Sequence, residues 1–370
     1  MPNVRSSSAI AVSSMRSATS PTSATAWVAS LSPWPEEFGL DGMRSLLGRL
    51  GAPQDAFPAV HVVGTNGKST ATRTIAELLR GEGLRAGAYT SPHVAGWHER
   101  LDCDPETFDR AVARVRGPAE ELRSTQFEVL TAAALLEFAE QGVDVAVVEA
   151  GLGGRLDATN VVDAEVVLLT NVALEHTEVL GDTREQIARE KLAVAHGARV
   201  VVMSDNTFES LVPGNADIVH GGAHEAAEAY LGRTIEHGAE VELAGRLERR
   251  GDEIRDGAHT PEAVDWLLAR IPARDYVLCV SILGEKRVDE LLERLGRAGS
   301  TFVATGSSNP RALPAKELAA RAEAHFADVH SVADPRKALA RARSFRRPVL
   351  VTGSLYLLAD LHAREEDGAR

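Results

Sequence analysis

The sequence predicts an α/β protein with a doubly wound parallel sheet, followed by a second, smaller α/β domain. Three observations support this fold class. Strand-like and helix-like segments alternate from Trp27 onward, a Gly-rich turn carrying Lys68 joins the first clear strand to a helix, and polar residues follow several of the strands. A chain of 370 residues is long enough for two domains with a core in each.

Short apolar runs predict the strands, and apolar residues at helical spacing predict the helices. In the first domain we expect strands at 59–63, 86–90, 144–149, 166–170 and 199–203, and helices at 70–81, 105–116, 127–140 and 183–195. In the second we expect strands at 276–282, 301–304 and 349–352, and helices at 286–298 and 314–325. The segment 205–245 has weak strand content, so the boundary is expected near Val241–Leu247.

These elements divide the chain into four parts. Residues 1–26 are rich in Ser, Ala and Thr without a periodic apolar face, and we expect a disordered extension there, with an organellar transit peptide as the alternative. Residues 27–242 form the first domain and 243–363 the second. The charged tail 364–370 is expected to fray.

Composition excludes several classes of protein. The formal net charge of −13 argues against non-specific binding to nucleic acid or to an acidic membrane. It also means that an anionic substrate needs basic residues placed locally. Cys103 and Cys279 lie far apart without metal-ligand spacing, which fits a reducing cytoplasm. No apolar run approaches the length of a membrane span.

The segment 59–70, AVHVVGTNGKST, predicts a phosphate-binding loop. A strand, a glycine turn and a helix N-terminus point backbone N–H groups and the helix dipole at an anion. The general P-loop places a glycine where this chain has Val62, and Gly64 instead begins a shorter loop. The loop residues expected to bind ATP are Gly64, Thr65, Asn66, Gly67, Lys68, Ser69 and Thr70.

Three side chains at the ends of successive strands predict a Mg²⁺ site. Ser91 follows 86–90, Glu149 ends 144–149, and His176 lies in the loop that begins with Asn171 after 166–170. The carboxyl ends of parallel strands are where open sheets bind ligands. A hydroxyl, a carboxylate and an imidazole there can hold Mg²⁺ against ATP oxygens, with waters completing the shell. Taken singly, His176 would be read as a capped loop histidine and Glu149 as an ion-pair member.

A series of motifs resembles one known family. GTNGKST, AYTSPH, FEVLTAAALLEF, VVEAGLGGRLDATN, EHTEVLGDTREQIAREK, DGAHTP and GSLYLLADL occur in the order seen in folylpolyglutamate synthase/dihydrofolate synthase, a branch of the Mur ligase family. The resemblance runs from about Phe38 to about Leu361. It implies an N-terminal ATPase domain, a smaller C-terminal Rossmann-like domain, and catalysis in the cleft between them.

Carried over position by position, the resemblance implies roles for individual residues. Lys68, His176 and Lys191 would be catalytic, and Lys191 would be carbamylated to hold a second Mg²⁺ beside the one held by Ser91, Glu149 and His176. Arg246 and Asp256 of the second domain would contact ATP. The residues that match the pterin-binding region are Thr125, Phe127, Glu128, Gly154 and Arg155. His259 could orient the closing loop or be a plain turn histidine.

The chain departs from the family pattern at several positions. Ser69 replaces the second glycine of GTNGKGS, Glu175 stands where Asp usually precedes the ligand histidine, and Thr260 replaces the Asn of DGAHNP. The segment between Lys191 and Arg246 is shorter than usual. These changes leave the residues expected to bind phosphate and metal in place. They affect the expected identity of the substrate and the expected contacts with the adenine of ATP.

The resemblance therefore implies an ATP-dependent amide ligase of folate biosynthesis. It would add L-glutamate to a pterin carboxylate, dihydropteroate or a reduced folate, through an acyl phosphate. The expected partners are these small molecules and ATP, with no nucleic acid or membrane, and a monomer is expected. Two alternatives stay open: another Mur-type ligase of a carboxylate and an amine, and a non-catalytic nucleotide-binding paralogue.

Overall fold

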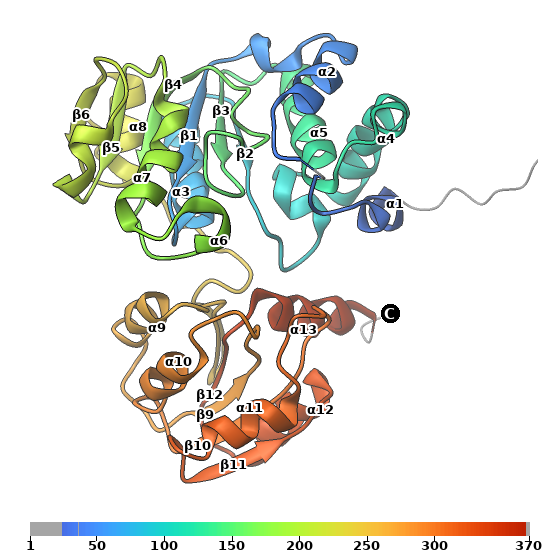
Figure 1. Ribbon diagram of the computed structural model, residues 1–370, viewed down its shortest axis with the longest axis vertical. Helices are drawn as coiled ribbons and strands as arrows, with labels where there is room; N and C mark the ends of the chain where they lie inside the picture. Colours follow the sequence, from blue (N-terminus) through green and yellow to red (C-terminus); the bar gives the residue numbers. More distant parts are fainter. Residues whose placement is uncertain (1–23, 36, 368–370) are drawn as a thin grey trace, which may run out of the picture.

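The computed structural model describes residues 24–35 and 37–367, which form two α/β units, one above the other in Figure 1. The first contains a six-stranded sheet of order β2-β3-β1-β4-β5-β6 in which every neighbouring pair is parallel. Its strands are β1 (Ala59–Val63), β2 (Ala86–Tyr89), β3 (Val145–Glu149), β4 (Ala164–Leu169), β5 (Val200–Met203) and β6 (Asp217–His220).

The second unit has a mixed six-stranded sheet of order β11-β10-β9-β12-β8-β7, in which only the pair β7–β8 is antiparallel. Its strands are β7 (Glu248–Arg250), β8 (Glu253–Arg255), β9 (Val277–Val280), β10 (Thr301–Ala304), β11 (Asp328–Ser331) and β12 (Val349–Thr352). The fold class predicted from the sequence is confirmed, with a short antiparallel edge added to the second sheet.

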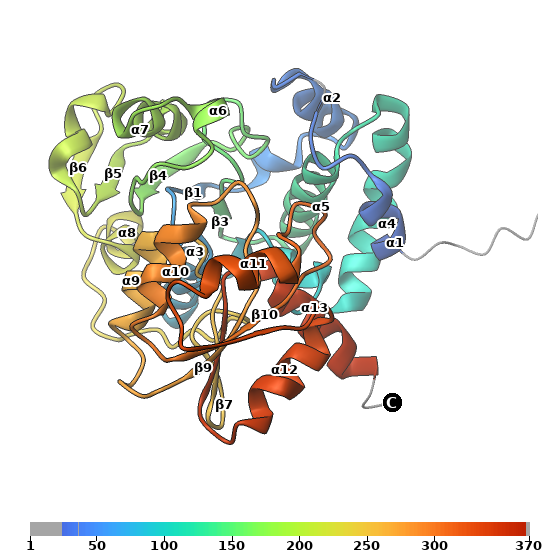
Figure 2. The same cartoon turned by 60° about the horizontal axis from the view of Figure 1, so that its bottom comes forward.

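Helices cover both faces of both sheets. The first unit has α1 (Ala24–Ser30), α2 (Asp41–Arg49), α3 (Lys68–Gly81), α4 (Pro105–Leu122), α5 (Gln126–Gln141), α6 (Thr177–Leu180), α7 (Arg184–Leu192) and α8 (Ala223–Leu231), with short 3₁₀ turns at η1 (Pro53–Ala56), η2 (Trp97–Leu101), η3 (Ala193–Ala195) and η4 (Asn206–Leu211). The second has α9 (Pro261–Leu268), α10 (Val288–Leu295), α11 (Ala315–Ala322), α12 (Pro335–Ser344) and α13 (Leu355–Asp367). In Figure 2 the second unit comes forward and α12 and α13 lie side by side.

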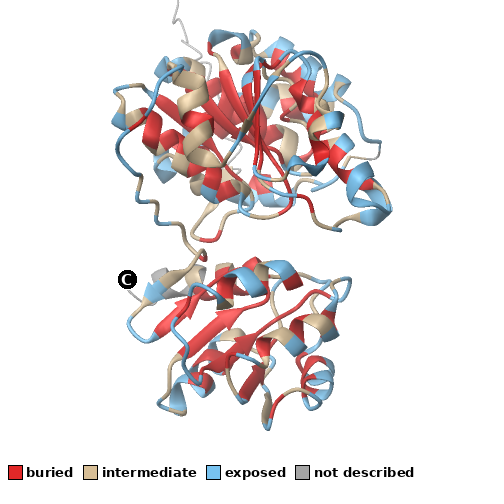
Figure 3. Cartoon of the chain, turned by 90° about the vertical axis from the view of Figure 1, so that its left-hand side faces the viewer, coloured by how far each residue is buried: buried red, intermediate tan, exposed pale blue. Residues whose placement is uncertain are grey.

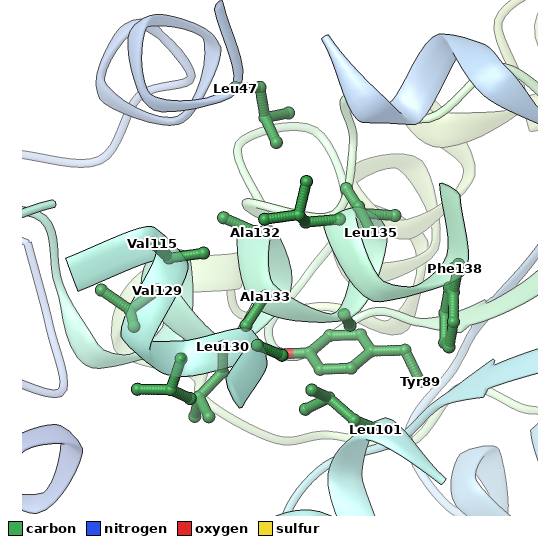
Figure 4. Close-up of a cluster of buried hydrophobic side chains, with 14 of the residues drawn as sticks. Leu47, Tyr89, Leu101, Val115, Val129, Leu130, Ala132, Ala133, Leu135 and Phe138 are labelled. Atoms are coloured by element: carbon green, nitrogen blue, oxygen red, sulfur yellow. The ribbon is translucent and has the colours of Figure 1, made fainter. Parts of the chain in front are cut away.

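The core of each unit follows the alternation of its strands. Val145 and Val147 of β3 pack under α3 and α8, while Ala146 and Val148 face α4 and α5 on the other side. Figure 3 shows the strands buried at the centre of each unit, with exposed helix faces outside. On the α5 side, Tyr89 lies among the apolar side chains drawn in Figure 4, and its hydroxyl accepts a hydrogen bond from Thr131 Oγ1 at 3.1 Å. A fully buried strand pattern of this kind is typical of parallel sheets.

The predicted strands match the observed ones within about two residues, but helix α4 differs from its prediction. It was expected to end at 116, before Gly117 and Pro118, and it continues to Leu122 with Pro118 inside. Val115 and Ala119 are buried against the α5 side of the core, and this packing outweighs the lost backbone hydrogen bond. The sequence also failed to predict β6, β7, β8 and β11, which are short and carry polar residues.

Both ends of the described part of the chain differ from the expectation. Helix α1 begins at Ala24 because Trp27 and Val28 are buried in the core, so residues 24–26 are helical. The backbone of 364–367, expected to fray, continues helix α13. Residues 1–23 and 368–370 lie outside the described part, so the rest of both terminal predictions is untested there. Among the described helices, none is both long enough and apolar enough to cross a membrane.

Candidate active site

The predicted phosphate-binding loop, residues 64–70, joins β1 to the first turn of α3 and is called the phosphate-type loop from here on. Its glycines adopt backbone conformations that residues with a Cβ rarely adopt. Gly64 has φ 143° and Gly67, the N-cap of α3, has φ 80°. A Cβ at Gly64 would also collide with Thr170 Oγ1. Lys68 Nζ donates to the carbonyl oxygens of Gly64 at 3.1 Å and Thr65 at 3.2 Å, so the ammonium lies over the loop. The loop therefore offers both a helix N-terminus and a cation to an anion.

Asn171, at the end of β4, fixes this loop from the side. Its Oδ1 accepts from Asn66 N at 3.0 Å, and its Nδ2 donates to Asn66 O at 2.8 Å. Thr65 N donates to Asn171 O at 2.9 Å. The loop conformation is thus held by neighbouring backbone and amide groups.

Glu149 connects the loop to Ser91. Its Oε1 accepts from Ser69 Oγ at 3.1 Å and its Oε2 from Ser91 N at 2.8 Å. Burial raises the pKa of the Glu149 carboxyl, while Lys68 and these hydrogen bonds oppose the rise. His176 is the N-cap of α6 with φ 44°, and burial lowers the pKa of its imidazole. Ser91, Glu149 and His176 line the same cavity.

The donor set suits a hard cation, since it offers hydroxyl and carboxylate oxygens with one imidazole. Within the described residues, no group of three or more His, Cys, Asp or Glu side chains is placed to hold a metal by itself. An ion at this place would therefore need Ser91, phosphate oxygens or water to complete its shell.

Lys191 of α7 is buried, with its side chain 2% exposed. Its Nζ donates to Gly64 O at 2.8 Å and to Glu175 Oε1 at 2.8 Å, so it joins the phosphate-type loop to the loop that carries His176. Burial lowers the pKa of Lys191, and Glu175 opposes this. Burial alone would raise the pKa of Glu175, but Lys191 and Lys68 outweigh it and bring that pKa to about 2. In this geometry the pair is an ammonium and a carboxylate.

Two of the cavity-lining segments come from the second domain. Asp256 Oδ2 accepts from Leu247 N at 2.8 Å and its Oδ1 from Ala258 N at 2.9 Å, which holds the segment 256–259. Arg246 lies in the adjoining segment, and its guanidinium donates to Gly245 O at 3.3 Å. Both Arg246 and Asp256 line the cavity that contains the phosphate-type loop.

The cavity that contains the phosphate-type loop, called the loop cavity from here on, has a volume of about 1170 Å³ and opens between the two domains. A second, aromatic cavity of about 320 Å³ adjoins it. The two share seven lining residues: Ser91, Pro92, Gly151, Leu152, His176, His259 and Leu355.

The predicted pterin-region residues divide into two groups. Thr125, Phe127 and Glu128 line the aromatic cavity, where the Phe127 ring lies 6.1 Å from that of Tyr89. Thr125 and Glu128 also form the capping box of α5, since Glu128 Oε2 accepts from Thr125 N at 2.8 Å. Gly154 and Arg155 instead attach their loop to α7: a Cβ at Gly154 would lie 2.7 Å from Glu190 O, and Arg155 pairs with Glu190 at 3.0 Å. These two do not appear among the residues lining either cavity.

Sequence reasoning missed several residues of the aromatic cavity. Arg100 is buried there, with Nε donating to His93 Nδ1 at 2.9 Å and its guanidinium 5.2 Å from the Trp97 ring centre. Asp157 is buried in the same wall, and its Oδ2 accepts from Leu152 N at 2.7 Å. Trp34 and Phe38 stand edge to face at 6.3 Å in the wall formed by the N-terminal segment. The sequence does show Arg100 three residues after Trp97, which could have suggested a binding site. The burial of Arg100, however, depends on tertiary packing.

Comparison with known families and proteins gives a consistent result. Residues 62–243 match the Mur ligase middle domain, and residues 245–355 match the Mur ligase, glutamate ligase domain. The folylpolyglutamate synthase of Lacticaseibacillus casei is 30% identical over 399 residues, covering 85% of this chain and 91% of that protein. A probable bifunctional folylpolyglutamate synthase/dihydropteroate synthase of Haloferax volcanii is 30% identical over 87% of this chain, which spans about half (48%) of that longer protein.

Solved structures with the same two-domain arrangement carry ligands. Mycobacterium tuberculosis folylpolyglutamate synthase complexed with ADP superposes with a TM-score of 0.83 at 27% identity, covering 91% of this chain and 96% of that one. A bifunctional folylpolyglutamate synthase/dihydrofolate synthase with Mn, AMPPNP and L-glutamate bound gives a TM-score of 0.79 at 26% identity, over 94% and 98% of the two chains. Relatives of this chain thus bind a nucleotide, a divalent metal and glutamate.

Proposed function

Because the chain belongs to the folylpolyglutamate synthase/dihydrofolate synthase branch of the Mur ligase family, we infer that it is an ATP-dependent glutamate ligase of folate metabolism. We propose that its substrates are ATP, L-glutamate and a pterin carboxylate, either dihydropteroate or a reduced folate. The carboxylate attacks the γ-phosphate of ATP, and the resulting acyl phosphate is attacked by the glutamate amine.

The meeting of the two cavities is the observation that carries this proposal. The loop cavity has the phosphate-type loop on one wall and Arg246 with Asp256 on the other. The aromatic cavity presents Phe127, whose ring face suits a flat heterocycle, and the buried polar groups of Arg100 and Asp157. A nucleotide in the first and a pterin in the second would bring phosphate and carboxylate together at Ser91, His176 and His259.

The residues of the first domain neutralise and position the phosphoryl group. Lys68 and the N–H groups at the start of α3 face the phosphates, where stabilisation of developing charge lowers the barrier. Ser91, Glu149 and His176 are the residues that would hold Mg²⁺, which when bound neutralises charge on phosphate oxygens.

The resemblance also leads us to propose a carbamate at Lys191, holding a second Mg²⁺. Burial favours the neutral amine that CO₂ requires. The contacts with Glu175 and Gly64 O are those of an ammonium, however, so carbamylation requires this ion pair to open. The mass of the intact protein, with bicarbonate and after its removal, tests the modification directly.

One assay tests the activity. Glutamate-dependent ADP release is measured first with dihydropteroate and then with tetrahydrofolate, and amide product is identified by mass. Release with the first alone indicates a dihydrofolate synthase, release with the second a folylpolyglutamate synthase, and release with both a bifunctional enzyme. Absence of glutamate-dependent ADP release with either would contradict the proposal.

Domain limits, oligomeric state and location are further parts of the proposal. We propose that 27–242 and 243–363 act as the two domains of a monomeric cytoplasmic enzyme. The segment between α8 and β7 contains the proposed division and joins the two sheets. Sedimentation at several concentrations tests the monomer.

A further inference from the structure

His259 lies where the two cavities meet. Seven residues line both cavities, and the polar side chains among them are Ser91, His176 and His259. The first two come from the first domain and belong to the proposed metal site. His259 comes from the second domain and has no role in that site, so it is available for another task at the same point.

The hydrogen bonding of His259 assigns its tautomer. Nδ1 lies 2.8 Å from Gly257 O, and because a carbonyl oxygen can only accept, Nδ1 carries the proton. Nε2 is then the unprotonated nitrogen. No side chain or backbone group in the described part of the chain bonds to it, so its lone pair can accept a proton from a ligand.

The backbone around His259 is fixed from several directions. Asp256 bonds to Leu247 N and Ala258 N, and Gly257 N donates to Gly245 O at 2.9 Å. Gly353 N donates to Ala258 O at 3.1 Å. These contacts tie the segment 256–259 to β12 and to the segment before β7, so the imidazole is held in place before any ligand binds.

Burial, together with the charges around the imidazole, keeps it neutral near pH 7. Burial is the largest cause, and Lys286 and Arg246 act in the same direction, while the bond to Gly257 and the Glu175 carboxylate oppose them. Together they bring the pKa of His259 to about 4. The neutral form is the one that accepts a proton.

We propose that His259 Nε2 accepts the proton released by the attacking amine in the second half of the reaction. This inference rests on the proposed function. After the glutamate ammonium has lost one proton to solvent, the neutral amine attacks the acyl carbon. The C–N bond forms and the carbonyl π electron pair moves onto its oxygen. The nitrogen, now positively charged and attached to the tetrahedral carbon, gives one proton to Nε2. The oxyanion then re-forms the C=O bond, the C–O bond to phosphate breaks with its electron pair going to phosphate, and the imidazolium returns the proton to the departing phosphate.

The test separates the two halves of the reaction. His259→Asn keeps a donor near the position of Nδ1 and removes Nε2. In single-turnover quench experiments with all three substrates, ADP and amide are measured in the same samples. We expect ADP to form at close to the wild-type rate, while amide formation falls by about 10²-fold or more. The matched control is His196→Asn, at an exposed histidine after η3, which should keep both rates.

A merely structural role gives a different result. Loss of loop order would slow ADP and amide formation together, and that outcome overturns the proposal, as does amide formation at the wild-type rate. His259→Gln is measured in the same way, so that one unstable variant does not decide the question. If the wild-type protein makes no amide from any pterin carboxylate, the proposed function fails instead.

Discussion

The two walls of the cleft hold their polar side chains differently. On the first-domain wall, Lys68, Glu149 and Lys191 each bond to groups of their own domain, and Lys191 with Glu175 forms a buried ion pair. On the second-domain wall, Arg246 has a guanidinium contact with Gly245 O, and His259 presents a nitrogen with no protein partner in the described chain. The first wall is therefore part of its own fold, whereas the second, apart from Asp256, exposes groups that are free to bind ligand. Variants of the two walls should differ accordingly.

The largest effect is expected at Lys191, where fold and chemistry coincide. Lys191→Ala should be nearly inactive, and it should lose about 3–5 kcal/mol of unfolding free energy because the Glu175 side chain, only 12% exposed, is left without its counter-charge. Turnover and denaturant unfolding measure the two effects. Partial recovery of turnover with acetate or formate would support the carbamate, and full activity of the variant would exclude Lys191 from the mechanism.

Lys68 is an exception on the first wall, and Lys68→Ala should affect chemistry without affecting the fold. Its ammonium bonds to two loop carbonyls, and no ion pair of Lys68 is found in the described chain, so we expect a melting temperature close to that of the wild type. The kcat should fall by about 10²-fold or more, because the phosphoryl group loses its neutralising cation. The exposed Lys316 of α11 gives the control, Lys316→Ala. Near wild-type turnover of Lys68→Ala would contradict its assignment.

The second wall should show a binding effect alone. Arg246→Ala removes a charged donor facing the loop cavity, and the loss of a hydrogen bond to a charged group corresponds to about a 10- to 100-fold rise in the KM for ATP. The melting temperature without ligand should stay near that of the wild type. A loss of stability as large as that of Lys191→Ala would show that the two walls do not differ as described.

His176 tests whether the metal belongs to the first wall. His176→Ala should raise the Mg²⁺ concentration needed for half-maximal activity by about 10-fold, with a smaller effect on melting temperature, because the N-cap side chain makes no capping hydrogen bond. Magnesium titration of the activity measures this. An unchanged requirement would remove His176 from the metal site.

The sequence predicted the first wall better than the second for a physical reason. The first wall is local: Gly64, Lys68, Ser91 and Glu149 each lie at the end of a periodic strand or the start of a helix, so pattern alone places them at one sheet edge. The contact between Lys191 and Glu175 depends on how α7 packs against the phosphate-type loop, which no pattern shows.

The second wall depends more on tertiary contacts. Asp256 and His259 were visible in the DGAHTP motif, but the free Nε2 of His259 follows from the path of the backbone at Gly257. Gly154 and Arg155 illustrate the opposite case. The resemblance assigned them to the pterin-binding region, and in the structure they contact Glu190 of α7, so their part in binding stays a prediction.

The smallest effect on activity is expected behind the first wall, at His61 of β1. Its Nε2 lies 2.9 Å from Thr159 Oγ1, which in turn donates to Asp157 of the aromatic cavity. Burial lowers the pKa of His61 to about 4. Between that value and the unfolded-state value of about 6.5, the unfolded chain binds a proton that the folded chain does not, so stability falls as pH decreases through this range.

Replacing the imidazole by an amide isolates this effect. For His61 the loss of unfolding free energy amounts to at most about 3.5 kcal/mol, from about 1.4 kcal/mol for each pKa unit. His61→Gln should keep turnover at neutral pH and should flatten the pH dependence of unfolding free energy between pH 6.5 and 4. His93 and His259 also have lowered pKa values, so some slope should remain in the variant. Denaturant unfolding at several pH values measures the slope. An identical slope in the wild type and the variant would mean that His61 is not the neutral buried group described. A loss of turnover at pH 7.5 would mean that the contacts of His61 and Thr159 with Asp157 are needed for catalysis.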